Sequence, residues 1–145
     1  MTTSIWHDSA NLDLETLNGL HKNTVCEVMG IQITEVGPNF VRGTMPADGR
    51  TFQPMGLVHG GSNVVLAETL GSIAANLVVD TSKYYCVGQE VNANHVRGVR
   101  KGVLTGTATL AYQGRSSQVW EIKIEDDRGK INCISRLTMA VVKHG

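Results

Sequence analysis

The sequence has little charge and no excess of either sign. Charged residues make up 18% of its 145 residues, below the roughly 25% of an average soluble domain, and 13 basic residues balance 13 acidic ones. Because a nucleic-acid backbone attracts clustered positive charge, a neutral chain is not expected to bind nucleic acid. The low charge fraction indicates a surface partly buried against another copy of the chain.

Cysteine pairs, a secretory signal and a membrane-length apolar run are also missing. Cys26, Cys86 and Cys133 are odd in number and widely spaced, so neither a disulfide framework nor a zinc knuckle is indicated, and a cytoplasmic location is expected. The N-terminus has neither a basic start nor an apolar core. Polar residues interrupt the longest apolar stretch, 64–79, which is too short for a membrane span.

The remaining pattern predicts one α+β domain over 1–145, with 1–11 loosely ordered. Leu14, Leu17 and Leu20 indicate a short amphipathic helix within 11–23. A long helix is expected over 62–79, and its apolar positions point in nearly every direction, so it must be surrounded. Strands are expected near 31–33 and over 40–45, 84–94, 103–112, 118–125 and 131–142. These features predict a curved antiparallel sheet wrapped around one long central helix, the hot-dog architecture.

Polar groups occur in the long helix where folding alone does not require them. Glu68 lies inside its apolar run, and Ser72 follows at i+4 on the same face. A buried unpaired carboxylate is costly, so Glu68 is either half of an ion pair or a functional group. Gly60 and Gly61, after His59, can present backbone N–H groups at the positive end of the helix dipole, where an oxyanion would be stabilised.

The spacing of these groups predicts a site shared between two chains. Gly60 and Glu68 are eight residues apart, about 12 Å along a helix axis, yet both would have to lie near one reacting group. Glu68 is therefore expected to act on a carbonyl held by the helix N-terminus of a neighbouring subunit.

Other catalytic templates fit less well. The sequence has no G-x-S-x-G, H-E-x-x-H or G-x-x-x-x-G-K motif. A metal site built on His59 and His95 would lack supporting cysteine or carboxylate ligands, so no metal is expected. His7, His21 and His144 are interpreted as surface residues.

Four segments taken in order resemble the hot-dog thioesterases: 53–61, 66–72, 92–95, and Gly114-Arg115 ahead of Val119-Trp120. More narrowly, they are similar to the branch with a helix glutamate, which contains the 4-hydroxybenzoyl-CoA, phenylacetyl-CoA and 1,4-dihydroxy-2-naphthoyl-CoA thioesterases. The resemblance covers most of the chain after about residue 12. Two departures are Gly98, where the family often has proline, and Met55, where it often has an aromatic residue.

The resemblance implies roles for particular residues. Glu68 would be the catalytic carboxylate, as nucleophile or as general base on water, and Gly60 would supply the oxyanion-hole N–H. Gln53 and His59 would contact the thioester, and Ser72 would position water. Residues implied in binding the acyl group or coenzyme A are Met55, Gly88, His95, Arg97, Arg115, Ser116 and Ser117, with Arg100 and Lys101 as further candidates for its phosphates.

The expected function is therefore hydrolysis of an aryl- or medium-chain acyl-CoA by a homo-oligomer, a dimer with shared sites within a dimer of dimers. Coenzyme A is part of the substrate, and no separate cofactor is expected. A hot-dog hydratase or dehydratase is an alternative, although the sequence lacks a His-Phe-Pro run. A non-catalytic acyl-CoA sensor is another, although the N-terminal segment is too short for a DNA-binding output element.

Overall fold

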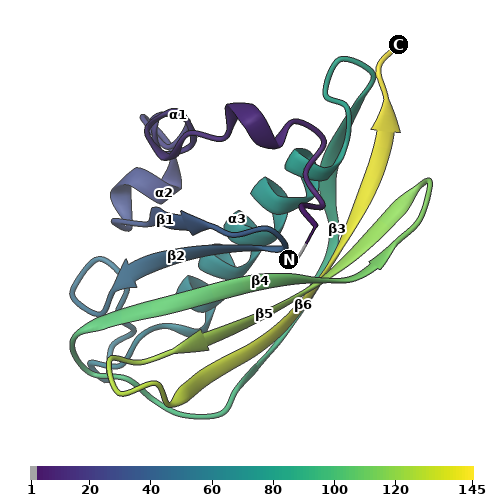
Figure 1. Ribbon diagram of the computed structural model, residues 1–145. Helices are drawn as coiled ribbons and strands as arrows, with labels where there is room; N and C mark the ends of the chain where they lie inside the picture. The colour runs from purple at the N-terminus through teal and green to yellow at the C-terminus, as the bar shows by residue number, and fades with distance from the viewer. Residues whose placement is uncertain (1–2) are drawn as a thin grey trace.

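The computed structural model describes residues 3–145. A six-stranded antiparallel sheet, in the order β1-β2-β4-β5-β6-β3, curves around the long helix α3 (Figure 1). The elements are the 3-10 helix η1 (Ser9–Asn11), α1 (Leu14–Gly19), α2 (Val25–Val28), β1 (Gln32–Val36), β2 (Phe40–Pro46), α3 (Gly60–Val78), β3 (Tyr84–His95), β4 (Val103–Gln113), β5 (Ser117–Glu125) and β6 (Ile131–Lys143). This arrangement confirms the expected hot-dog architecture.

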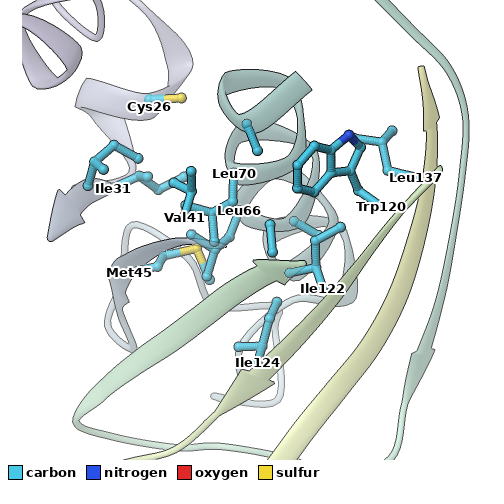
Figure 2. Packing of buried hydrophobic residues seen from close by; sticks show 14 of the residues in the cluster. Cys26, Ile31, Val41, Met45, Leu66, Leu70, Trp120, Ile122, Ile124 and Leu137 are labelled. Atoms are coloured by element: carbon cyan, nitrogen blue, oxygen red, sulfur yellow. The ribbon is translucent and has the colours of Figure 1, made fainter. Parts of the chain in front are cut away.

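One face of α3 packs directly on the concave side of the sheet. Leu66 and Leu70 are fully buried there, among core residues of β2, β5 and β6 (Figure 2). Gly43 and Gly106 are partners across β2 and β4, and a Cβ atom on either would lie 2.7 Å from Leu70. The paired glycines therefore let the helix approach the sheet closely, which fixes the position of the helix face that carries the site.

The segment before η1 closes the roll at the C-terminal end of α3. Trp6 stacks on Trp120 with ring centroids 6.3 Å apart, and its indole N–H donates to the carbonyl of Gly37 at 2.7 Å. The backbone N–H of His7 donates to the carbonyl of Leu77 in the last turn of α3. These contacts hold the segment before η1 against the C-terminal end of α3.

The region expected to be one helix over 11–23 contains a turn, and a second helix, α2, follows it. Thr24 caps α2 by accepting from the N–H of Cys26. The burial of α1 also differs from the expectation, because Leu20 is 66% exposed whereas His21 is only 8% exposed. The interpretation of His21 as a surface residue is wrong, since its ring lies between α1 and β1 and bonds to the carbonyl of Ile31.

The sheet does not cover all of α3. Val65 and Ile73 are only partly buried, and they face α2 rather than the sheet. The apolar residues on this side of α3 therefore line a groove instead of completing the core. None of the helices between residues 3 and 145 is long and apolar enough to cross a membrane.

Candidate active site

Glu68 lies at the centre of the candidate site, on the half-buried side of α3. Its carboxylate faces Gly88 of β3, where a Cβ atom would lie 2.3 Å from Glu68 Oε2. Any larger residue at position 88 would therefore push the carboxylate away. No ion pair to Glu68 exists in the described part of the chain, so the structural alternative of an intrachain ion pair is not supported.

The carboxylate borders an apolar groove between α2 and α3. The groove has a volume of about 430 Å³, and both Glu68 and Ser72 line it, which confirms that they share a face of the helix. The Ser72 hydroxyl lies 3.7 Å from the sulfur of Met139. The remaining lining residues are Leu20, His21, Thr24, Val25, Cys26, Val65, Thr69 and Ile73. An apolar slot with a carboxylate in its wall suits an apolar acyl group with its reactive end at Glu68.

The N-terminus of α3 presents one unused backbone donor. The first four N–H groups of a helix have no intrahelical partner. Here the N–H of Gly61 donates to His59 Nδ1 at 2.8 Å, and the N–H groups of Ser62 and Asn63 donate to the His59 carbonyl. Of these four N–H groups, only that of Gly60 has no acceptor among the described residues, so it can stabilise an oxyanion.

Two histidines flank that donor. Because His59 Nδ1 accepts a hydrogen bond from Gly61, the proton of its neutral ring is on Nε2, which can donate to a substrate. His95, at the end of β3, lies over the helix N-terminus, and a Cβ atom on Gly60 would meet its Nε2 at 2.7 Å. The side-chain amide of the buried Asn63 bonds to His95 Nδ1 at 3.3 Å. The Nε2 edge of His95 is thereby turned toward Gly60.

Gln53 and Met55 belong to the loop that leads into α3. Gln53 Oε1 accepts from the N–H of Met55, and the Gln53 N–H donates to the carbonyl of Leu57 at 2.8 Å. The amide NH₂ of Gln53 remains available as a donor. Met55 is 73% exposed, which is unusual for an apolar side chain beside a candidate site.

The candidate phosphate-binding residues fall into two groups at opposite ends of β4. Arg97, Arg100 and Lys101 border a cavity of about 490 Å³ next to the β5–β6 turn, which Asp126, Asp127 and Arg128 also line. Arg115 and Ser116 occupy the β4–β5 turn instead. Arg97 is already paired with Asp126. Hydrogen bonds from the backbone N–H of Lys130 and from Arg97 and Arg128 lower the pKa of Asp126 to about 2. Because the two groups of candidate residues lie at opposite ends of β4, they do not form one phosphate site within a single chain.

Cys86 and Cys133 do not supply a nucleophile. Cys133 and Cys86 are buried and free, and burial raises the pKa of Cys133 to about 11 and shifts the pKa of Cys86 in the same direction. Since the thiolate is the reactive form, neither thiol is activated. Across residues 3–145, no three His, Cys, Asp or Glu side chains are arranged to hold a metal ion.

Within one chain the predicted residues form two separate clusters. Glu68 and Ser72 line the groove, with Gly88 of β3 against Glu68, whereas His59, Gly60 and His95 lie at the N-terminus of α3. Gly60 and Glu68 are eight residues apart on that helix. The sequence interpretation missed two residues. Asn63 gave no signal beyond its place in the helix, whereas His21 lies at i+4 from Leu17 and so could have been assigned to the buried face of α1.

Comparison with known proteins places these features in a family. The profile described as "Thioesterase superfamily" matches residues 55–133. The chain is 41% identical to the 1,4-dihydroxy-2-naphthoyl-CoA hydrolase of Escherichia coli, over 95% of this chain and 99% of that protein. It is 44% identical to the proofreading thioesterase EntH of Cronobacter turicensis, over 95% and 98% of the two chains. A crystal structure of a mutant thioesterase from Pseudomonas aeruginosa superposes with a TM-score of 0.94 at 50% identity, covering 97% of this chain and all of that one.

Proposed function

The chain belongs to the thioesterase superfamily and is a thioester hydrolase, and from that premise we propose that it hydrolyses an aryl- or medium-chain acyl-CoA with Glu68 as the catalytic carboxylate. The observation that carries the proposal is the position of Glu68, without an ion-pair partner in the described residues, in the wall of an apolar groove. The products are the free acid and coenzyme A. Water is the only other reactant, so the reaction needs no separate cofactor.

Two routes are open to the Glu68 carboxylate. As a general base it takes a proton from water, the hydroxide attacks the thioester carbon, and the C–S bond breaks as the proton passes to the departing thiolate of coenzyme A. As a nucleophile it attacks the carbon itself, releases the thiolate and forms a mixed anhydride that water then hydrolyses. Ser72, on the same groove, is proposed to position the water in either route.

The oxyanion that forms on the thioester carbonyl needs donors, and the α3 N-terminus supplies them. We assign this role to the unused N–H of Gly60, with His59 Nε2 and the Gln53 amide directed at the thioester. Since Gly60 and Glu68 are about 12 Å apart along α3, one chain cannot apply both to one carbonyl. The proposed site therefore combines Glu68 of one subunit with Gly60 of another.

The free edge of the sheet favours such a pairing. β3 is an edge strand of 12 residues, and an exposed edge of that length is a template for pairing with a second chain. Gly88 and His95 pair with the core residues Met139 and Cys133, so both lie on the concave face. In a regular strand, residues seven positions apart point to opposite faces of the sheet. The irregularity between Gly88 and Glu90 adds one residue, and Gly88 and His95 therefore lie on the same face.

An antiparallel β3–β3 pair can bring the two clusters together. If its two-fold axis passes through Asn92, which then lies opposite its own copy, the irregularity between Gly88 and Glu90 brings Gly88 of one strand opposite His95 of the partner subunit. Glu68, which faces Gly88, then approaches the α3 N-terminus over which the partner's His95 lies. A homodimer of this form would hold two shared sites. We further propose that two such dimers associate into a tetramer, a dimer of dimers.

Coenzyme A also requires a place for its phosphates. The cavity bordered by Arg100, Lys101 and Arg128 opens at the same end of the molecule as the α3 N-terminus, since the backbone N–H of Val58 donates to the carbonyl of Val99. We propose this cavity as the phosphate site for a thioester bound at the α3 N-terminus of the same chain. Arg115, Ser116 and Ser117 lie too far along the sheet in that chain and would serve only a site of another subunit.

Release of free thiol from acyl-CoA substrates tests the proposal. Benzoyl-, hydroxybenzoyl-, phenylacetyl- and medium-chain acyl-CoAs are offered to the wild type, to Glu68→Gln, and to Glu15→Gln as a control on the exposed face of α1. We expect turnover of at least one aryl or medium-chain ester, a loss of at least about 100-fold in kcat for Glu68→Gln, and wild-type rates for Glu15→Gln. Thiol release that survives Glu68→Gln would exclude Glu68 as the catalytic group.

A further inference from the structure

Asn63 is a buried polar residue in the first turn of α3 whose presence the helix itself does not explain. Its side chain is 1% exposed, and its Oδ1 atom has no hydrogen-bond partner among the described residues. The helix is already capped, because His59 Nδ1 accepts from the N–H of Gly61. Asparagine is a weaker helix former than alanine or leucine, and an unpaired buried acceptor lowers stability. A role outside folding is therefore indicated for Asn63.

The side-chain amide of Asn63 bonds to a histidine outside the helix. Asn63 Nδ2 lies 3.3 Å from Nδ1 of His95, the last residue of β3. An amide NH₂ group can only donate, so His95 Nδ1 accepts and the proton of the neutral ring is on Nε2. Asn63 therefore selects one of the two neutral forms of the His95 ring and fixes the direction of its N–H group.

The protonated Nε2 atom of His95 lies close to the free backbone donor of the same chain. A Cβ atom on Gly60 would lie 2.7 Å from His95 Nε2. Because a Cβ atom is about 2.5 Å from the backbone nitrogen of its own residue, the Gly60 nitrogen and His95 Nε2 are at most about 5 Å apart. An oxygen that accepts from each of them at about 2.9 Å fits between two donors at that separation. The two N–H groups can therefore bind one carbonyl oxygen.

The other histidine at this end of the helix is held in the same form by a different group. His59 Nδ1 accepts from the backbone N–H of Gly61 at 2.8 Å, so the helix backbone sets the position of the proton on the His59 ring. His95 belongs to β3, and among the described residues its ring has no hydrogen-bond partner other than Asn63. Asn63 thus does for His95 what the helix backbone does for His59.

We propose that Asn63 is a positioning residue for thioester hydrolysis, which holds His95 with its proton on Nε2 so that this N–H and that of Gly60 donate to the same carbonyl oxygen. The inference rests on the proposed function, because the thioester oxygen is taken to lie at the α3 N-terminus. Both hydrogen bonds strengthen as the oxygen becomes negative in the transition state. Asn63 should therefore affect kcat more than KM.

A double-mutant cycle tests the proposal, with the acyl-CoA ester that the wild type hydrolyses fastest as substrate. His95→Ala removes the donor and should lower kcat by about 100-fold. Asn63→Leu keeps the branched shape of the side chain but leaves the His95 ring free to turn or to move its proton. It should lower kcat by about 10-fold and leave KM within about twofold of the wild-type value. In the His95→Ala background, Asn63→Leu should have no further effect, because it acts through His95.

Ser62→Ala is the matched control for Asn63→Leu. The Ser62 hydroxyl donates to the carbonyl of Thr51 at 3.0 Å, so its loss also removes a side-chain hydrogen bond from the first turn of α3, and kcat should stay within about twofold of the wild-type value. An unchanged kcat in Asn63→Leu, or an equal loss with and without His95, would overturn the inference and leave the thioesterase proposal intact. Absence of thiol release from every ester by the wild type would overturn the proposed function itself.

A spectroscopic measurement locates the ring proton in the wild type without any assay of activity. Protein with ¹⁵N-labelled histidine is observed near pH 8, above the ordinary histidine pKa of about 6.5, and the signals missing from His95→Ala identify the His95 ring. We expect the proton on Nε2 in the wild type, and a shift of the proton toward Nδ1 in Asn63→Asp, whose carboxylate accepts instead of donating. A wild-type His95 ring that carries its proton on Nδ1 would contradict the proposal.

Discussion

A glycine opposite the helix glutamate determines where the carboxylate can lie. Glu68 Oε2 occupies the space that a Cβ atom on Gly88 would need. The backbone of Gly88 is not in a left-handed conformation, so the conformational freedom of glycine is not what this position requires. Position 88 instead requires a residue without a side chain, because the Glu68 carboxylate fills the space beside it.

Gly88→Ala should therefore impair activity far more than stability. The added methyl group displaces the carboxylate, and a misplacement of about 1 Å can cost about 100-fold in rate, whereas the unfolding free energy should change by less than about 1 kcal/mol. Steady-state thiol release and chemical denaturation give the two quantities. In a Glu68→Gln background, Gly88→Ala should have no further effect on activity.

Gly49→Ala is the matched control for this prediction, because no atom lies within 4 Å of a Cβ atom there. Equal losses of activity from Gly88→Ala and Gly49→Ala would contradict the role given to the Glu68–Gly88 contact. Sedimentation of both variants checks that neither change alters the association of subunits.

The sequence predicts the functional residues that belong to a local sequence pattern. It does not predict those whose role depends on contacts with distant parts of the chain. Glu68 stands out because a charge interrupts an apolar helix, and Gly60 because glycines follow a histidine at a helix start. His21 and Asn63 are buried polar residues whose partners, the Ile31 carbonyl and His95, come from elements distant in sequence. Their importance depends on tertiary packing, which local periodicity does not encode.

At the scale of elements, the turn between β5 and β6 holds together the loop that follows β3. Asp126 accepts from the N–H groups of Arg128 and Lys130 and from the side chain of Arg97. The side chain of Asn132 also donates to the carbonyl of Arg97. This network ties the loop over 96–102, which borders the proposed phosphate site, to the sheet.

Acid should weaken the network over a defined range. The pKa of Asp126 is lowered from 3.8 to about 2 in the folded chain, so the unfolded chain binds this proton more readily. The stabilisation is complete above the unfolded value and is lost as the pH falls from about 5 toward 2. The unfolding free energy of wild type minus that of Asp126→Asn should therefore decrease across this range.

Denaturation at pH 5, 4 and 3 measures that difference. Asp8→Asn, on the exposed N-terminal segment, controls for the removal of one negative charge. If the gap between wild type and Asp126→Asn stays constant from pH 5 to pH 3, the carboxylate does not stabilise the turn in the way described.

The strands and the long helix were predicted closely, because alternation and an unbroken apolar run extend over many residues. β4, for example, extends one residue beyond the expected range of 103–112, and α3 begins two residues before the expected start. Helix α2 was missed because four residues are too few to show periodicity. Its Thr24-x-x-Glu27 sequence has the capping-box pattern, and this signal could have located it, although in the structure Glu27 accepts from the N–H of Asn23 rather than from that of Thr24.

At the scale of the whole molecule, the two halves of the proposed chemistry lie on one rigid helix and cannot meet within one chain. The edge strand β3 runs past both groups, with Gly88 against Glu68 and His95 against Gly60. Low overall charge and exposed Tyr85 and Val87 on that strand favour its pairing with a second copy. The central claim is therefore that each site is built by two subunits.

Mixed dimers test that claim most directly. Glu68→Ala removes the carboxylate, and Gly60→Pro removes the N–H at a first helical position, where the backbone suits proline. The proline ring also displaces His95 of the same chain, which lies at the site that is already inactive. Each variant alone should be inactive, yet a mixed dimer would contain one site with both groups intact. In dimers verified to carry one chain of each kind, we expect roughly half of the wild-type thiol release per dimer. Verified mixed dimers that are as inactive as either parent would contradict the shared site.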